Sequence, residues 1–225
     1  LRSPGLFVFL ILTVTTAAFW PGLSGGFLFD DYPNIVQQDM VHADRITLES
    51  MRKAAGAFNH GPLGRPIPTL SFAIDHARWG MDPWGYKRSS LVVHLVNSVL
   101  VFLLVCRLLP LAGTPRGPST SAAFAVALLW AIHPLQVSTV LYVVQRMETL
   151  SLAFVLMALL CYLRGRVKQA TGERAWPWLL ACVPLVVLGL LCKETAALFP
   201  AYALALELTV LGFRARNPST ARLCG

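Results

Sequence analysis

Long apolar runs alternate with short polar links along most of the chain, and this pattern predicts an all-α, polytopic membrane bundle of about six spans. A bilayer core of about 30 Å needs about 20 apolar residues in helical form. Several runs approach that length with no acidic residue inside them. The expected spans are 6–23, 91–109, 121–144, 149–163, 176–192 and 195–213. The third span is broken at His133-Pro134, and Arg146 and Glu148 interrupt the chain before the fourth.

The basic residues of the short links indicate how the bundle is oriented. If the spans alternate, one end carries Arg2, the link 107–116, the link 164–174, and Arg214 with Arg216. The positive-inside rule assigns that end to the cytoplasm. The opposite end then faces the periplasm of a bacterial inner membrane or the lumen of the endoplasmic reticulum.

The long connection 27–88 lies at the non-cytoplasmic end and holds seven of the eleven acidic residues, so it is the one soluble-looking part. From Pro68 onward, apolar residues recur at i, i+3, i+4 and i+7, whereas Asp75 falls elsewhere on the helical wheel. The apolar residues are Leu70, Ala73, Ile74 and Ala77. This spacing predicts an interfacial helix lying on the membrane. A second, weaker helix is expected over 46–58.

Composition supports a membrane protein and excludes other classes. The chain is 56% hydrophobic and 13% charged, against about 25% charged for a soluble domain. Its net charge of +8 does not indicate nucleic-acid binding, because the basic residues cluster between apolar runs without interleaved stacking aromatics. The five cysteines have no paired spacing that would predict a disulfide framework or a zinc site. We expect one membrane module over 1–213 and a polar, unstructured tail over 214–225.

Asp30 and Asp31 are the first candidate catalytic residues, since they directly follow the first span. Adjacent carboxylates at a membrane surface repel each other and resist desolvation, so the pKa of at least one should be raised. A raised pKa suits a general base, and two carboxylates could also hold a divalent cation. The alternative is a solvated turn, because perturbed carboxylates mark functional sites only probabilistically.

Lys193 and Glu194 form the second candidate, because opposite charges adjoin between two apolar runs. Ionisable residues at membrane depth are costly and suggest function. Lys193 could direct its ammonium to an anion such as a lipid phosphate, while Glu194 compensates the charge. The alternative is a pair that caps a helical hairpin, with the long lysine side chain extending to water.

Three further positions could contact a substrate. Arg146 could bind a phosphate in bidentate fashion or act as an interfacial anchor, and Arg65 is a similar candidate in the long connection. His133 breaks a span, and broken helices at membrane depth line a cavity or are buried in protein. His94 and Asn97 lie inside the second span, where a buried polar pair usually bonds a neighbouring helix.

Six short motifs, taken in order, resemble one family. They are Phe29-Asp30-Asp31, Gly64-Arg65-Pro66, His94-Leu95-Val96-Asn97, His133-Pro134, Val144-Gln145-Arg146-Met147-Glu148 and Cys192-Lys193-Glu194. The chain is similar to the GT-C superfamily of membrane glycosyltransferases, closest to the protein O-mannosyltransferase branch and the transmembrane proteins with tetratricopeptide repeats. The similarity extends over 6–213. Where animal relatives carry a His and a Glu after the His-Pro pair, this chain has Gln136 and Ser138.

The resemblance implies an inverting enzyme that takes a sugar from a polyprenyl- or dolichyl-phosphate donor. The acceptor would be a hydroxyl of a protein or glycan on the periplasmic or lumenal face. By this analogy Asp30 or Asp31 is the base, and Arg146 and Lys193 hold the donor phosphate. Arg65 and Glu194 support them, and His133 and Glu148 also contact substrate. Family members carry further spans and often a soluble domain, so the chain is expected to be part of a longer protein.

Two other functions remain open from the residues alone. One is a non-catalytic membrane scaffold or a truncated remnant of such an enzyme. The other is a transporter, which would place ionisable residues near mid-membrane in discontinuous helices. The charges of this chain cluster at one interface instead, so transport is disfavoured.

Overall fold

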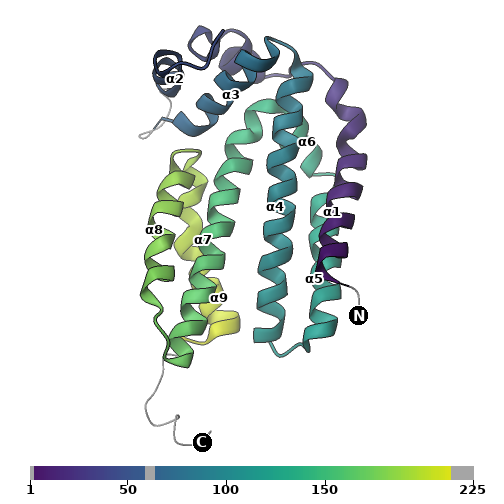
Figure 1. Ribbon diagram of the computed structural model, residues 1–225, viewed down its shortest axis with the longest axis vertical. Coiled ribbons are helices and arrows are strands. Elements are labelled where there is room, and N and C mark those ends of the chain that lie inside the picture. Colours follow the sequence, from purple (N-terminus) through teal and green to yellow (C-terminus); the bar gives the residue numbers. More distant parts are fainter. Residues whose placement is uncertain (1–2, 59–63, 214–225) are drawn as a thin grey trace, which may run out of the picture.

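The computed structural model describes residues 3–58 and 64–213, which form helices joined by turns, without a strand in either range. Six helices run side by side as a column, and short helices form a head at one end (Figure 1). The column helices are α1 (Pro4–Phe19), α4 (Pro83–Leu111), α5 (Arg116–Ala131), α7 (Arg146–Thr171), α8 (Trp176–Leu190) and α9 (Phe199–Leu206). Arg2, Arg214, Arg216 and the predicted tail lie outside the described residues.

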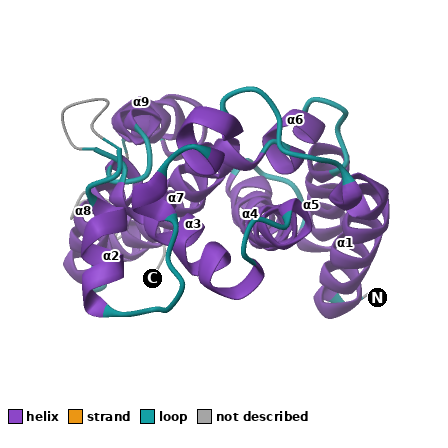
Figure 2. Ribbon diagram, turned by 90° about the horizontal axis from the view of Figure 1, so that it is seen from above, coloured by secondary structure: helices purple, strands orange, loops and turns teal. Residues whose placement is uncertain are grey.

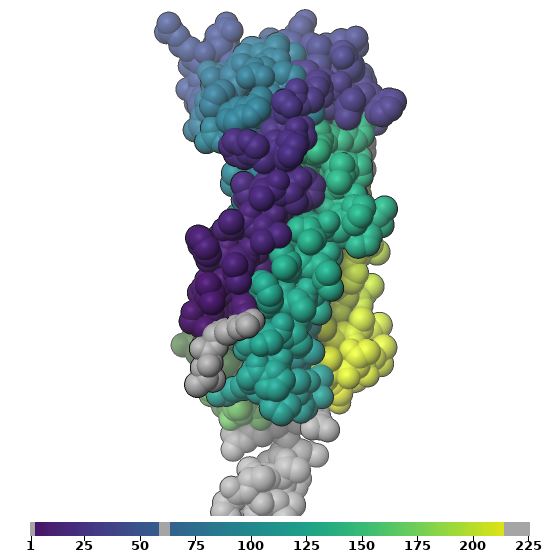
Figure 3. Space-filling view, turned by 90° about the vertical axis from the view of Figure 1, so that its right-hand side faces the viewer, coloured from purple at the N-terminus to yellow at the C-terminus, as the bar shows by residue number. Residues whose placement is uncertain are grey.

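The long connection builds most of the head. It contains α2 (Leu48–Ala55) and α3 (Pro66–Trp79), with single helical turns at Tyr32–Val36 and Asp39–Val41. After α5, the short helix α6 (Gln136–Leu141) packs against α4 and α7 at the upper end of the column, and the helical turn Val143–Gln145 leads into α7. Further helical turns extend α1 over Trp20–Ser24 and flank α9 over Glu194–Leu198 and Glu207–Leu211. Figure 3 shows the head at the top of the column, above α1, α5 and α9.

In the described part of the chain, four helical segments are long and apolar enough to cross a membrane, namely Pro4–Ser24, Pro83–Leu111, Val143–Thr171 and Glu194–Leu211. The outer surface of the column exposes large apolar side chains such as Phe9, Leu129 and Val183, which are 62%, 66% and 59% exposed. Apolar surface on this scale would be a liability in water, so these side chains contact lipid. The predicted helical membrane bundle is confirmed. The number of spans stays a prediction, because α5 and α8 have only 16 and 15 residues.

Helix α4 joins the two halves of the column. Seen from the head, it lies between α1 and α5 on one side and α7 with α8 and α9 on the other (Figure 2). Phe7 of α1 packs against Phe102 of α4, and its ring stacks on Phe124 of α5 with centroids 4.6 Å apart. Ala123 and Ala127 are fully buried in the same cluster. Small residues four apart let α5 approach its neighbours closely, as is typical of membrane helices.

Several helices begin earlier than expected, and for α4 and α7 the earlier start brings charged residues into the helix. α4 starts at Pro83 and not at residue 91, because Asp82 accepts the N–H of Trp84 at 3.0 Å and a proline occupies the first turn. Lys87 and Ser90 are then buried inside the protein, 2% and 0% exposed. α7 starts at Arg146 and not at residue 149, so Arg146 and Glu148 belong to its first turn and do not precede the helix. The break at His133-Pro134 is confirmed, since it separates α5 from α6.

The prediction for α3 is right about the helix but wrong about what covers its apolar face. Leu70 and Ala73 pack with Ala54 and Met51 of α2, so protein covers this face and not the membrane. Asp75 also differs from the expectation of a solvated polar side, because it is only 3% exposed. The second helix predicted over 46–58 is present as α2.

We expect labelling of introduced cysteines to divide the molecule into two sides. Asp39→Cys, exposed in the head, and Leu135→Cys, exposed in the turn before α6, should react with a membrane-impermeant maleimide from the non-cytoplasmic side. Arg116→Cys and Glu173→Cys, in the links at the other end, should react only after permeabilisation. The unsubstituted chain gives the background from its own cysteines. Labelling of all four positions from one side would contradict the orientation.

Candidate functional site at the junction of head and column

A cavity of about 430 Å³ lies where the head meets α7 and the turn before Glu194. Its lining combines charged, polar and apolar side chains from four separate parts of the chain. The lining residues are Asp30, Pro33, Asn34, Phe58, Arg65, Val144, Gln145, Met147 and Lys193. The cavity thus brings together three of the residues predicted from sequence, namely Asp30, Arg65 and Lys193.

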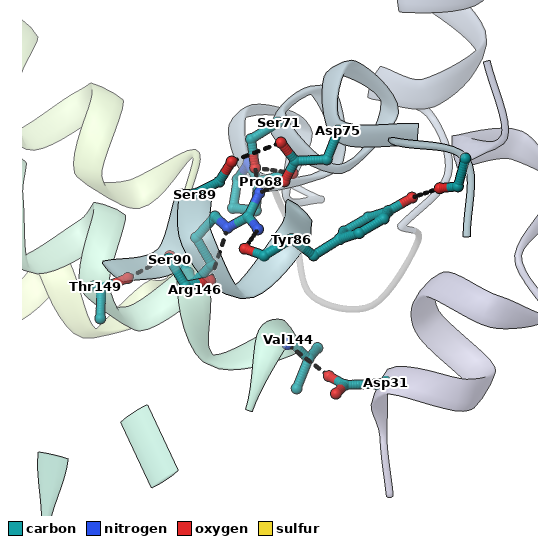
Figure 4. Close-up of polar contacts among 11 residues, drawn as sticks. Asp31, Pro68, Ser71, Asp75, Tyr86, Ser89, Ser90, Val144, Arg146 and Thr149 are labelled. Atoms are coloured by element: carbon teal, nitrogen blue, oxygen red, sulfur yellow. Dashed lines mark hydrogen bonds and ion pairs between the residues drawn. The ribbon is translucent and has the colours of Figure 1, made fainter. Parts of the chain in front are cut away.

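Asp31 fixes one wall of this cavity. Its carboxylate is buried and accepts the backbone N–H of Val144 at 2.7 Å (Figure 4). It also accepts the backbone N–H of Val143 at 3.3 Å and that of Leu28 at 3.0 Å. Burial raises the pKa of Asp31, although these N–H groups lower it. The carboxylate is closed to solvent and ties the first connection to the start of α7. In this structure its role is to position neighbouring backbone.

Asp30 is the exposed member of the pair. Its backbone N–H donates to the hydroxyl of Tyr142 at 2.7 Å, and its carbonyl accepts from the side-chain amide of Asn34 at 2.7 Å. These contacts hold the residue at the edge of the cavity. Burial raises the pKa of Tyr142. The hydrogen bond with the Asp30 backbone lowers this pKa, whereas the charge of the Asp30 side chain raises it, so the phenol stays protonated at neutral pH. Of the two predicted bases, Asp30 is the one open to a substrate.

Arg65 and Lys193 supply the positive charge of the cavity. Arg65 donates to Glu194 at 3.1 Å and to the sulfur of Met147 at 3.2 Å, and its guanidinium lies over the ring of Phe58. Its Nε is buried without a hydrogen-bond partner among the described residues. A donor left unsatisfied inside a protein favours an acceptor that can reach it. Glu194 is the counter-ion predicted from sequence, but it pairs with Arg65 and not with its neighbour.

Lys193 reaches the cavity from the turn between α8 and the Glu194–Leu198 helical turn. Its ammonium lies 2.8 Å from the carboxylate of Glu148, which also accepts the hydroxyl of Thr195 at 2.8 Å. Both members of this ion pair are partly exposed, at 25% and 33% of their side chains. Glu148 therefore serves as the counter-ion of Lys193, on the first turn of α7.

Arg146 is the main correction to the predicted site. It is 1% exposed and forms four hydrogen bonds inside the head (Figure 4). Its guanidinium pairs with Asp75 at 2.5 Å and donates to Ser71, Ser90 and the carbonyl of Tyr86 at 3.2, 3.1 and 2.6 Å. A guanidinium satisfied in this way has no open edge for a phosphate. It joins α7 to α3 and α4 instead.

His133 is the second correction. It is exposed in the turn between α5 and α6, where its Nδ1 accepts the backbone N–H of Leu135 at 3.2 Å. It is absent from the lining of the cavity. The histidine stabilises the turn that follows the broken span and does not share the cavity of Arg65 and Lys193.

The residues at the Asp30-Asp31 pair do not fit a divalent cation. Asp31 accepts three N–H groups, which occupy three of the about four lone-pair positions of its carboxylate. Arg65 and Lys193 also line the cavity beside Asp30, and their charge opposes cation binding. Over 3–58 and 64–213 no cluster of three or more His, Cys, Asp or Glu side chains is arranged as metal ligands.

Known proteins have sequences similar to that of this chain over most of its length. Protein O-mannosyl-transferase TMTC3 of Mus musculus is 31% identical over 195 residues, which are 83% of this chain and 20% of that protein. The corresponding Homo sapiens protein is 31% identical over 193 residues, 82% of this chain and 20% of its own. Protein O-mannosyl-transferase Tmtc1 of Drosophila melanogaster is 31% identical over 180 residues, with shares of 77% and 19%.

The chain is homologous to the TMTC proteins. This confirms the resemblance to the protein O-mannosyltransferase branch. The chain spans about one fifth of the length of these TMTC relatives. No protein-family model matches it, and no solved structure matches it.

Several residues of the candidate site escaped the sequence analysis. Asp75 was assigned to a polar helix face, yet it is the counter-ion of Arg146. Lys87 was left without a role, although it is buried and its charge acts on Asp31. Tyr142 precedes the Arg146 motif and holds Asp30. An acidic residue on an amphipathic helix and a lysine at a helix start are ordinary surface features, so only the fold reveals these contacts.

Proposed function

We propose that this chain is the donor-binding part of a membrane glycosyltransferase. The enzyme takes a sugar from a polyprenyl- or dolichyl-phosphate donor and transfers it to a hydroxyl of a protein acceptor. The names of the relatives support mannose as the sugar and protein as the acceptor. The positive-inside rule supports a periplasmic or lumenal position for the cavity.

The observation that carries this proposal is the pairing of Arg65 and Lys193 on one cavity beside Asp30. Each cation already has a partial counter-ion, in Glu194 and Glu148 respectively. A phosphodiester could share or displace those carboxylates, because charge-assisted bonds from Arg and Lys to phosphate are among the stronger contacts in proteins. Arg65 Nε offers one donor that no described residue uses.

Asp30 acts as the base in the proposed reaction. The acceptor hydroxyl gives its proton to the Asp30 carboxylate while its oxygen bonds to the anomeric carbon of the sugar. The bond between that carbon and the phosphate oxygen breaks, and the polyprenyl phosphate leaves with the electron pair. Attack from the side opposite the leaving group inverts the anomeric centre. Arg65 and Lys193 stabilise the charge that develops on the phosphate.

Replacing Lys193 tests the phosphate role. Lys193→Met keeps the length of the side chain and removes its charge, so we expect affinity for a polyprenyl-phosphate sugar to fall about ten- to hundredfold. Donor binding is measured on protein in phosphatidylcholine nanodiscs, alongside thermal unfolding. Lys168→Met is the matched control, because Lys168 forms an ion pair with Glu173 at 2.6 Å in the link between α7 and α8.

Removing either counter-ion should not weaken donor binding. Glu148→Gln frees Lys193 from its carboxylate, so donor affinity should stay the same or rise. Glu194→Gln should act in the same direction through Arg65. If Lys193→Met lowers thermal stability while donor affinity is unchanged, the ion pair is structural. The non-catalytic scaffold would then be the better account of the chain.

A further inference from the structure

A second cavity, of about 250 Å³, lies inside the column between α4, α6, α7 and α9. Most of its lining is apolar or uncharged, and Glu148 is its one charged residue. Its lining includes His94, Asn97, Trp130, Thr139, Leu198 and Tyr202. No described residue lines both this cavity and the donor cavity. The two cavities are connected by the ion pair between Glu148, which lines this one, and Lys193, which lines the donor cavity.

His94 lines this cavity and carries an unsatisfied acceptor. Its side chain is fully buried, and its Nε2 lies 2.9 Å from the carbonyl of Ala131. A carbonyl can only accept, so Nε2 carries the proton. In the neutral ring Nδ1 is then an acceptor, and Nδ1 has no partner among the described residues. A buried imidazolium without a partner would be costly, which favours the neutral form.

Asn97 presents a second unsatisfied acceptor by the same logic. Its Nδ2 donates to the carbonyl of Thr149 at 2.8 Å, which fixes the orientation of the amide. Its Oδ1 is buried and has no partner in the described part of the chain. His94 and Asn97 are one helical turn apart on α4, so both acceptors belong to one face of the helix.

The chemistry of these atoms defines the ligand. Two acceptors repel a phosphate and require donors, such as hydroxyl groups. Trp130 stacks against His94 with ring centroids 5.3 Å apart and adds an aromatic wall. Leu198 and Tyr202 at the rim are 50% and 45% exposed on a segment apolar enough to span a membrane. A ligand therefore enters from the bilayer.

We propose that this cavity binds the hydroxylated head of a neutral membrane amphiphile, with His94 Nδ1 and Asn97 Oδ1 accepting from its hydroxyls. The apolar part of the ligand lies against Trp130 and the exposed side chains of α9. This site is separate from the proposed donor site, where the unsatisfied group is a donor, Arg65 Nε. It does not depend on the glycosyltransferase proposal.

Three probes test the inference on protein in phosphatidylcholine nanodiscs by native mass spectrometry. Monooleoylglycerol supplies hydroxyls on an acyl chain, methyl oleate has the chain without a hydroxyl, and methyl α-mannoside is a water-soluble polyol. We expect monooleoylglycerol to bind at least about tenfold more tightly than methyl oleate. Stronger binding of the mannoside than of monooleoylglycerol would overturn the membrane source of the ligand.

Variants connect the binding to the two acceptors. His94→Phe keeps an aromatic ring beside Trp130 but removes the acceptor, and should weaken monooleoylglycerol binding about three- to tenfold. Thr139 lies on α6 and is half-buried, so Thr139→Trp should fill the cavity and abolish binding while the His94 side chain itself is kept. His42→Phe is the control, since His42 also bonds a backbone carbonyl, that of Ile35, but lies outside the cavity.

Two outcomes would refute the proposal. Equal affinity for monooleoylglycerol and methyl oleate would mean that the two acceptors form no hydrogen bond with the hydroxyl groups of the ligand. Unchanged binding in both His94→Phe and Thr139→Trp would place the amphiphile elsewhere, with water satisfying the two acceptors.

Discussion

Arg146→Met is expected to lower the free energy of unfolding by about 3–5 kcal/mol, the usual cost of breaking a buried ion pair. The substitution leaves Asp75 charged and only 3% exposed. It also removes donors from Ser71, Ser90 and the carbonyl of Tyr86. Because these partners lie on α3 and α4, the head should detach from α7 before the column unfolds. The measurement is thermal and denaturant unfolding of the purified protein in nanodiscs.

A double-mutant cycle separates the ion pair from the rest of the network. Asp75→Asn alone leaves Arg146 charged and buried, and should also be destabilising. The double variant should be less destabilised than the sum of the two singles, because neither charge remains unpaired. Lys168→Met, in an ion pair with Glu173 whose side chains are 25% and 57% exposed, should change stability by about 1 kcal/mol or less.

The same experiment decides whether Arg146 contacts the donor. If Arg146→Met kept full stability while losing affinity for a polyprenyl-phosphate sugar, the phosphate role predicted from sequence would be restored. We expect the reverse, with donor affinity falling only as far as the folded fraction falls. Arg65 and Lys193 then remain the two cations that face the cavity.

The apolar runs predicted the column well because each helix buries or exposes a continuous apolar surface. The start of α4 was misplaced for a physical reason. Lys87 and Ser90 look like the end of a polar connection, yet the head covers them, and burial by distant residues leaves no periodic signal. The break at His133-Pro134 was predictable, because proline removes a backbone donor and ends α5 locally.

The site was only partly predictable. Arg65 and Lys193 were found because cations at a membrane interface are unusual, and the fold brings both to one cavity. The buried ion pair of Arg146 could not be predicted, because its partner, Asp75, is 71 residues away in sequence. An arginine that binds phosphate and one that pairs with a buried carboxylate are identical in a single sequence. Contacts between distant residues decide between them, and these come from the three-dimensional arrangement.

Asp30→Asn is expected to reduce sugar transfer about 10²- to 10⁴-fold, the usual contribution of a general base. The amide is nearly isosteric with the carboxylate but cannot accept the proton of the acceptor hydroxyl. Folding should be little affected, because Asp30 is exposed and its contacts to Tyr142 and Asn34 are made by its backbone. The assay is mannose transfer from a dolichyl-phosphate donor to peptides in membranes that contain the protein.

Asp31→Asn should also reduce transfer, but through the structure. An amide offers one acceptor oxygen where the carboxylate offers two, so at least one of the N–H groups of Leu28, Val143 and Val144 loses its bond. An unsatisfied buried donor costs about 1–3 kcal/mol, and the lowered thermal stability identifies the mechanism. Asp39→Asn is the control for both, since its side chain is 94% exposed. Transfer at the unsubstituted rate in Asp30→Asn would exclude it as the base, whereas loss of transfer at full stability in Asp31→Asn would make Asp31 the base instead.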